Sequence, residues 1–203
     1  MWRFIVVVFV ALTGCASVNT QDTYTGAMRS SLFVDTEGGS GSAVVLNDRC
    51  ALTAKHVAQD AKNMKVVTWT EKEYPVTEVY LAEFMDLAVV CIADHFIERP
   101  VVIRRQMPEP YSGIFVVGNP LGIRNTITTG LYQGEDRMSA PIAWGNSGGG
   151  VFDESGQLIG IAVAVSVRRI EQYVFVFPHL GVMETSRNIV QFLDENHIRY
   201  TGV

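Results

Sequence analysis

The sequence has few residues of the kinds that hold metals or contact nucleic acids. Its 203 residues include only four histidines, and none is paired at a spacing typical of metal ligands. The sequence has 16 basic and 21 acidic residues, which gives a net charge of −5. The basic residues are scattered along the chain. That balance argues against nucleic acid as a partner. His95, His179 and His197 are interpreted as surface residues, and no metal or other cofactor is predicted.

The N-terminus lacks an apolar run of the roughly 20 residues that a membrane-spanning helix needs. A single cation, Arg3, precedes the shorter run Phe4–Leu12, which is typical of an export signal. The next residues, 12–15, resemble a bacterial lipobox, in which the cysteine is lipidated and becomes the new N-terminus. We therefore predict a lipoprotein signal peptide over 1–14 and a lipid on Cys15. A plain secretory signal with an incidental cysteine is the alternative.

Export with a lipid on Cys15 predicts a protein of the bacterial cell envelope. Ala16, in place of aspartate after the cysteine, favours an outer-membrane protein that faces the periplasm. Residues 16–29 are polar and small, without helical or strand periodicity. We predict a polar tether over 15–30, although such a segment is also compatible with ordering against a neighbouring subunit.

From Ser31 onwards, short runs rich in β-branched and aromatic residues alternate with turn residues, which indicates strands. The strands expected before a linker at 94–100 are Leu32–Asp35, Gly41–Leu46, Cys50–Ala54, Met64–Thr70, Tyr74–Glu83 and Leu87–Ala93. Those expected after it are Val101–Arg105, Gly113–Gly118, Thr126–Tyr132, Met138–Ala140, Gly150–Phe152, Leu158–Val167 and Tyr173–Phe177. The pattern predicts an all-β barrel or sandwich. Apolar residues at helical spacing over 182–196 predict one C-terminal surface helix.

Ser147 lies in the glycine-rich stretch Trp144–Gly150, directly before an apolar run. Glycines at 145 and 148 leave room for a substrate carbonyl and permit unusual backbone angles. The stretch is typical of an exposed nucleophile, with an oxyanion hole formed by the N–H groups of Gly145 and Ser147. Read alone, it is also compatible with a plain glycine-rich turn between strands.

A serine nucleophile needs a neighbouring base, usually a histidine held by a carboxylate. Of the histidines, only His56 follows a short apolar strand and a small-residue turn, in Leu-Thr-Ala-Lys-His-Val. Asp86 stands at the start of the apolar run Asp-Leu-Ala-Val-Val. A carboxylate in that place is either exposed at the strand end or paired with a buried partner.

His56, Asp86 and Ser147, in this order and in these motifs, resemble the trypsin-like, chymotrypsin-fold serine peptidases. Residues Gly118–Gly122 and Thr126–Gly130 are similar to the loop and strand between aspartate and serine in the bacterial Deg/HtrA branch. The resemblance implies an all-β fold of two packed six-stranded antiparallel β-barrels with a C-terminal helix. The protease domain is then expected over 31–203, without a PDZ domain after it.

Within that domain, the resemblance implies barrel one over about 31–94, barrel two over about 101–178 and the helix over about 182–196. Phe175–Pro178 resembles the segment that closes the second barrel in the Deg branch. Cys50 and Cys91 are then antiparallel neighbours in barrel one. A disulfide between them and a pair of buried thiols both remain open.

The resemblance also implies the catalytic roles. His56 is the general base, Asp86 orients it, and Ser147 attacks a peptide carbonyl. The primary pocket is expected at Ile161, Ala162, Val163 and Ala164, where no acidic residue stands, so that a small or medium aliphatic residue before the cleaved bond is predicted. The expected partner is a peptide or unfolded protein. Relatives in this branch are commonly trimers, which is compatible with a homo-oligomer here.

Two departures from digestive trypsins are visible. Asn146, not aspartate, precedes the nucleophile, and no Ile-Val-Gly-Gly start is present. The resemblance therefore suggests control by ordering of the loops at 121–125 and 139–146 instead of by zymogen cleavage.

Two other functions compete with this interpretation. The Gly-x-Ser-x-Gly elbow of lipases requires a helix after the serine, with aspartate and histidine downstream, whereas here a third glycine and a strand follow. The stronger rival is a catalytically silent protease-like lipoprotein that binds peptides or a partner protein in the same cleft.

Overall fold

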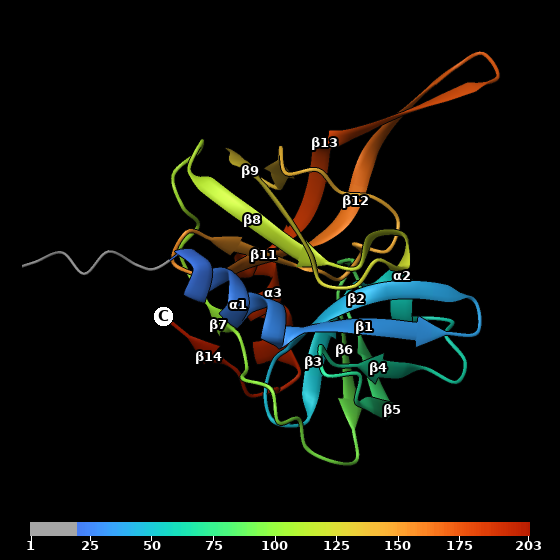
Figure 1. Cartoon of the computed structure of the whole chain (residues 1–203), viewed down its shortest axis with the longest axis vertical. Coiled ribbons are helices and arrows are strands. Elements are labelled where there is room, and N and C mark those ends of the chain that lie inside the picture. Colours follow the sequence, from blue (N-terminus) through green and yellow to red (C-terminus); the bar gives the residue numbers. More distant parts are fainter. Residues whose placement is uncertain (1–19) are drawn as a thin grey trace, which may run out of the picture.

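The computed structural model describes residues 20–203 and folds them into two packed barrels of antiparallel strands (Figure 1). The predicted signal segment over 1–14 and the lipidation residue Cys15 lie outside the described residues. Barrel one is a closed ring in the order β1-β2-β3-β6-β5-β4. Its strands are β1 (Ser31–Thr36), β2 (Gly39–Val45), β3 (Cys50–Thr53), β4 (Lys65–Val67), β5 (Glu73–Leu81) and β6 (Ala88–Ile92).

Barrel two is a ring in the order β11-β8-β9-β10-β13-β12, closed by pairing of β11 with β12. Its strands are β8 (Gly113–Gly118), β9 (Thr126–Gly134), β10 (Arg137–Met138), β11 (Gly150–Asp153), β12 (Leu158–Ile170) and β13 (Tyr173–Thr185). Two short strands, β7 (Val102–Ile103) and β14 (Thr201–Gly202), extend the sheet in parallel pairing beyond β12. The prediction of two six-stranded barrels is confirmed.

The described helices are short. They are α1 (Thr20–Ser30), α2 (Lys55–Ala58), the 3-10 turn η1 (Pro120–Gly122) and α3 (Ser186–Glu195). Within residues 20–203, none is long and apolar enough to cross a bilayer. The C-terminal helix was expected over 182–196, but β13 continues to Thr185 and the helix begins at Ser186.

The end of barrel two also corrects the interpretation of Phe175–Pro178. These residues lie on a hairpin that projects from the barrel, and all of them are exposed (Figure 1). The segment that closes the barrel is Gly181–Thr185, which pairs with β10 and with β12. The segment Phe175–Pro178 therefore resembles the closing segment of the family in composition, but it does not occupy that position in the barrel.

The two barrels share an apolar interface, and strand alternation explains why several strands are buried on both faces. Val44 and Val89 belong to the cluster between the barrels, while their neighbours Val45 and Val90 fill the interior of barrel one. Successive side chains in a strand point to opposite faces. Strand β6 is buried at every position for this reason, and it holds the cleft side of barrel one firmly against barrel two.

Helix α1 corrects the expectation of an unstructured tether over 15–30, because residues 20–30 are helical. The Tyr24 ring meets the Phe115 ring edge-on, with 4.7 Å between the ring centroids, and Ala27 enters the inter-barrel cluster. The Ser30 hydroxyl donates to the Arg99 carbonyl (2.8 Å). Tyr24, Ala27 and Met28 lie at i, i+3 and i+4 and form one apolar side of the helix. Packing of this side against the barrels stabilises the helix although the segment is mostly polar.

Cys50 and Cys91 form a disulfide in barrel one, which decides between the two alternatives left open by the sequence. The two cysteines are direct cross-strand partners on β3 and β6. These are the strands that lead to His56 and away from Asp86, respectively. The disulfide therefore lies at the far end of the strand pair that carries these two side chains.

Asp153, at the end of β11, is a buried carboxylate with four donors. It accepts hydrogen bonds from Arg104 (2.8 Å) and Ser155 (2.6 Å) side chains and from the backbone N–H groups of Ser155 (2.9 Å) and Gln157 (3.0 Å). Burial raises the pKa of Asp153, but these hydrogen bonds outweigh it, and the net pKa lies below the ordinary value. The carboxylate is therefore ionised in the folded protein.

We expect Asp153→Asn to lower the free energy of unfolding by about 1 to 3 kcal/mol at neutral pH. Because the folded-state pKa is depressed, the carboxylate stabilises the fold above about pH 4, and this contribution is lost as the pH falls further. Urea unfolding at pH 7 and pH 3 measures both effects. The exposed Asp94→Asn is the control, and equal losses in the two variants would contradict the assignment.

Candidate active site

Three predicted site residues meet in the cleft between the barrels. His56 lies on α2, directly after β3, and Asp86 lies just before β6. Ser147 lies in the loop between β10 and β11. Barrel one thus supplies His56 and Asp86, and barrel two supplies Ser147. His56 and Ser147 line the same two hollows of the cleft.

His56 and Asp86 are held by two contacts. His56 Nδ1 lies 2.7 Å from Asp86 Oδ2, and the His56 backbone N–H donates to Asp86 Oδ1 at 3.0 Å. Burial raises the pKa of Asp86, but the hydrogen bonds from His56 outweigh it, so that the net pKa is below the ordinary value. An ionised carboxylate only accepts hydrogen bonds. Nδ1 therefore carries a proton, and in the neutral imidazole the free lone pair is on Nε2.

Two residues that the sequence did not single out fix this pair. The Lys55 ammonium donates to the carbonyls of Ala82 (2.6 Å) and Glu83 (3.1 Å), which ties α2 to the turn before Asp86. The Asp86 backbone N–H donates to Glu184 Oε1 on β13 (2.9 Å). Glu184 therefore connects the position of Asp86 to barrel two.

The loop around Ser147 is docked onto both barrels through its backbone. The Ser147 carbonyl accepts from the Ser42 N–H (2.8 Å), and the Gly148 N–H donates to the Ala162 carbonyl (2.7 Å). Gly148 has a φ of +84°, and an added Cβ would lie 2.0 Å from the Ser42 carbonyl oxygen and 2.3 Å from Thr53 Oγ1. Only glycine fits this approach.

We expect Gly148→Ala to lower the free energy of unfolding by about 3 kcal/mol or more, because backbone strain and a backbone clash act together. Gly122→Ala is the matched control, since Gly122 has a similar φ of +78° but open space around it. The control should lose only about 1 to 2 kcal/mol from the left-handed conformation. Urea unfolding measures the free energy of unfolding of both variants. Equal decreases in the two variants would show that the close packing around Gly148 does not exclude a Cβ atom.

The two N–H groups predicted to form an oxyanion hole belong to a loop that is held by backbone hydrogen bonds. The Trp144 carbonyl accepts a hydrogen bond from the Leu121 N–H (2.7 Å). Because the peptide bond is trans, the Gly145 N–H points away from that carbonyl. Within residues 20–203, neither the Gly145 N–H nor the Ser147 N–H has a hydrogen-bond acceptor. Both donors are therefore available to a ligand, and the Leu121–Trp144 bond joins the two loops suggested to control activity.

A buried network of Ser42 and Asn119 supports the same loop. Ser42 Oγ donates to the Gly145 carbonyl (2.6 Å) and accepts from the Asn119 N–H (2.9 Å). The Asn119 amide group donates to Ser42 Oγ (3.0 Å) and to the Leu32 carbonyl (3.0 Å). Neither residue was predicted, although Asn119 lies in the motif Gly118–Gly122. These contacts fix the peptide that follows Gly145.

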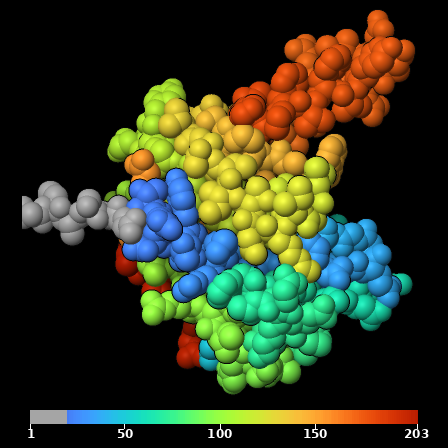
Figure 2. Space-filling model, in the orientation of Figure 1, coloured from blue at the N-terminus to red at the C-terminus, as the bar shows by residue number. Residues whose placement is uncertain are grey.

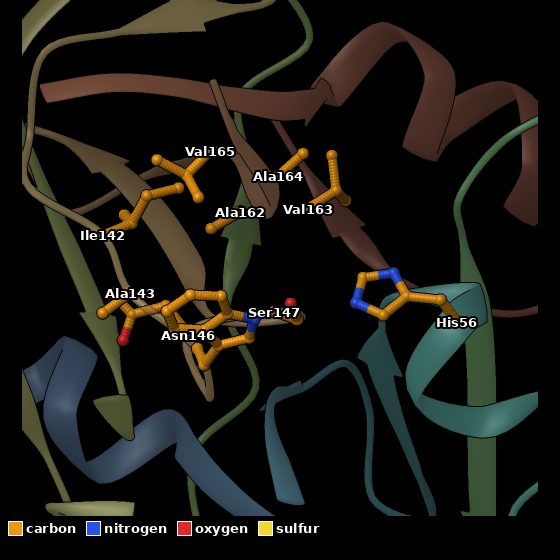
Figure 3. A pocket seen from close by; sticks show the side chains of 10 residues that line it. His56, Ile142, Ala143, Asn146, Ser147, Ala162, Val163, Ala164 and Val165 are labelled. Atoms are coloured by element: carbon orange, nitrogen blue, oxygen red, sulfur yellow. The ribbon is translucent and has the colours of Figure 1, made fainter. Parts of the chain in front are cut away.

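No hydrogen bond joins the Ser147 hydroxyl to His56 in the described part of the chain. Catalytic hydrogen bonds are often long without substrate and shorten when substrate binds. Figure 3 shows the imidazole on one side of Ser147 and the side chains of Ile142, Ala162 and Val165 on the other. Ser147 thus lies between the base and an apolar cavity.

That cavity has a volume of about 240 Å³, and its lining contains no ionisable side chain other than His56. Of the predicted pocket residues, Ala162, Val163 and Ala164 line it. Ile161 does not, because it is fully buried in the inter-barrel cluster, and its place in the prediction is corrected. The cavity is also lined by Asn146 and by four further residues that were not predicted for the pocket, Ile142, Ala143, Trp144 and Val165.

A second hollow of about 340 Å³ lies on the barrel-one side of Ser147. It is bordered by the β1–β2 turn, by His56 and Val57 on α2, and by Gly145. Trp144 lines both hollows and is 71% exposed. An extended chain laid across Ser147 has room on both sides of the nucleophile.

Comparison with known proteins agrees with this geometry. The model of the trypsin-like peptidase domain matches residues 39–161, which is more than half of the chain. A Bacillus subtilis protein named serine protease Do-like HtrA is 27% identical, over 89% of this chain and 46% of that protein. A Synechocystis protein named putative serine protease HhoB is 30% identical, over 64% of this chain and 35% of that protein. The chain spans less than half of the length of these curated relatives.

Solved structures support the fold. The serine endoprotease from Yersinia pestis superposes with a TM-score of 0.76 at 23% identity, over 90% of this chain and 67% of that chain. An inactive form of Rv3671c from M. tuberculosis H37Rv superposes with a TM-score of 0.74 at 20% identity, over 93% of this chain and 96% of that one.

Proposed function

The chain belongs to the trypsin-like peptidase domain family, and on that premise we propose that it is a serine endopeptidase that acts through an acyl-enzyme intermediate. The observation that carries the proposal is the cleft itself. An imidazole that is hydrogen-bonded to an ionised carboxylate lines the same cavity as a serine whose loop presents two free N–H groups.

The proposed reaction follows from these contacts. Nε2 of His56 takes the proton from Ser147 as its hydroxyl oxygen attacks the peptide carbonyl, and Asp86 stabilises the imidazolium that forms. The N–H groups of Gly145 and Ser147 bind the oxyanion. His56 then gives its proton to the leaving amine, which departs as the peptide bond breaks. Water, activated by the same imidazole, hydrolyses the acyl-enzyme and frees Ser147.

The apolar cavity sets the proposed preference. Its volume of about 240 Å³ and its lining of alanine, valine and isoleucine suit a small or medium aliphatic side chain before the cleaved bond. A basic side chain finds no carboxylate there, because the cavity residues carry none. The substrate class is therefore unfolded polypeptide or peptide that presents such a residue in an extended segment.

Digestion of a denatured protein mixture with the purified chain tests the proposal. Mapping of the new N-termini should show cleavage after alanine, valine or similar residues, and rarely after lysine or arginine. Peptides bound but never cut would instead support the catalytically silent binder. Cleavage mainly after basic residues would contradict the assignment of the cavity.

We also propose that the protein is exported and held at the bacterial outer membrane by a lipid on Cys15. The signal-like run after Arg3 supports this, and the Cys50–Cys91 disulfide supports an oxidising compartment. Cells fed labelled palmitate should yield labelled protein in the membrane fraction, and a Cys15→Ala variant should carry no label. Label retained by that variant would refute the lipid site.

A further inference from the structure

Strands β12 and β13 continue beyond barrel two as a two-stranded ribbon, here residues 166–177. Ser166 pairs with Phe177, Arg168 with Phe175, and Ile170 with Tyr173. The ribbon projects from the body of the molecule in the cartoon and in the space-filling picture, and no other strand of the described chain flanks it (Figures 1 and 2). An isolated two-stranded ribbon is marginally stable in water unless something packs against it.

The ribbon is apolar although it is exposed. Cross-strand partners share a face, so Tyr173, Phe175 and Phe177 line one face together with their partners Ile170, Arg168 and Ser166. Tyr173 is 60% exposed and Phe175 is 47% exposed. The opposite face carries Val167, Val174 and Val176, which are exposed as well. Contiguous exposed apolar surface of this kind marks an interaction site.

The ribbon is continuous with the catalytic cleft. The β12 residues Ala162–Val165 line the apolar cavity beside Ser147. The pairing of β11 with β12 ends at Ile161, and backbone hydrogen bonds from the nucleophile loop reach only to Ala162. Beyond Ala162, within the described residues, β12 pairs on one edge with β13 and has no partner on the other. This free edge starts at the cavity and runs into the ribbon.

We propose that the ribbon is an exosite for the substrate polypeptide, which adds as an extended strand to the free edge of β12 and packs apolar side chains on the ribbon. The proposal rests on the proposed peptidase function. An exposed strand edge binds extended peptides through main-chain hydrogen bonds, and side chains supply the selectivity. The cavity takes the residue before the cleaved bond, so the ribbon contacts residues further towards the substrate's N-terminus.

The position and charge of the ribbon define the segment it binds. A strand advances about 3.3 Å per residue, so that a substrate must extend about four or more residues upstream of the cleaved bond to reach Ser166. Arg168 and Arg169 outnumber Glu171 on the ribbon, whereas the whole chain has a net charge of −5. We therefore expect the substrate segment upstream of the cleaved bond to be apolar and aromatic. Any charged residues in that segment should be acidic and not basic.

Two fluorogenic peptides with the same residues around the cleaved bond test the proposal. The short peptide has three residues before that bond, and the long one has ten, with alternating phenylalanine and valine and one glutamate. The variant is Phe175→Ser with Phe177→Ser. The matched control is Ile97→Ser with Tyr111→Ser, which removes apolar side chains that are 73% and 74% exposed elsewhere.

We expect the ribbon variant to lower kcat/KM for the long peptide by about tenfold or more and to leave the short peptide unchanged. The control should change neither. Equal kcat/KM of the ribbon variant and wild type on the long peptide would overturn the exosite. A change in sedimentation or in binding to phosphatidylglycerol vesicles, with no selective loss on the long peptide, would overturn it in favour of a second copy or a membrane.

A failure of the proposed function can be distinguished from a failure of the exosite. If the wild-type chain cleaves neither peptide, fluorescence anisotropy of the labelled long peptide still measures its affinity for the ribbon. Weaker binding to the ribbon variant than to the control supports the exosite without catalysis. Equal binding to both overturns it.

Discussion

Replacing Ser147 with alanine is expected to lower the rate of peptide-bond cleavage by on the order of 10⁶-fold while the fold survives. The hydroxyl supplies the attacking oxygen, and no other nucleophile is needed to form or break the acyl-enzyme. The side chain makes no hydrogen bond in the described chain, so its loss leaves no buried partner unsatisfied. The Ser147 backbone groups, which dock the loop on Ser42, remain in alanine.

Initial rates on a fluorogenic peptide, with circular dichroism and thermal unfolding on the same samples, measure this effect. Ser112→Ala is the control, since Ser112 lies at the start of barrel two outside both hollows of the cleft. The control should keep wild-type activity. Cleavage by Ser147→Ala near the wild-type rate would assign the reaction to another residue.

Replacing Asp86 with asparagine is expected to lower kcat by on the order of 10⁴-fold. An asparagine amide can donate to His56 Nδ1, which places the imidazole proton on Nε2, where a lone pair is required. The fold should persist, because the hydrogen bond from the Asp86 N–H to Glu184 uses the backbone. Asp35→Asn is the control, because Asp35 is a half-buried carboxylate in barrel one that lies near Lys65 (3.4 Å).

The thermal stability of the Asp86→Asn variant should also depend on pH differently from that of wild type. Because the folded-state pKa of Asp86 is depressed, its carboxylate stabilises the fold above about pH 4, and that contribution disappears as the pH falls. Asp86→Asn should therefore show a smaller decline of thermal midpoint between pH 5 and pH 3 than wild type. An identical decline would contradict the ionised His56–Asp86 pair.

Most of the fold could be predicted because each barrel strand is a short apolar run ended by turn residues. Two segments illustrate what could not be predicted. Helix α1 offers only Tyr24, Ala27 and Met28 as an apolar stripe, and its burial depends on Phe115, more than 80 residues away in the sequence. The residues Phe175–Pro178 were predicted to belong to the barrel because apolar residues follow the same pattern in an exposed ribbon as in a buried strand.

The site was predictable where a local motif carries the chemistry, as at His56, Asp86 and Ser147. Its supports were not, because they act across the barrels. Ser42 contacts a carbonyl 103 residues away, and Glu184 contacts a backbone N–H 98 residues away. Val165 joins the cavity beside Ala164 where the pairing of β12 with β13 shifts register, which no sequence period indicates.

The central claim is that a base from barrel one activates a nucleophile from barrel two. The second-order rate of labelling by a fluorophosphonate, with the adduct located by mass spectrometry, tests it most directly. Wild type should carry the adduct on Ser147, and His56→Ala should be labelled about 10³-fold more slowly while its circular dichroism spectrum shows that the fold is retained. Equal labelling of both proteins, or an adduct on another residue, would contradict the account.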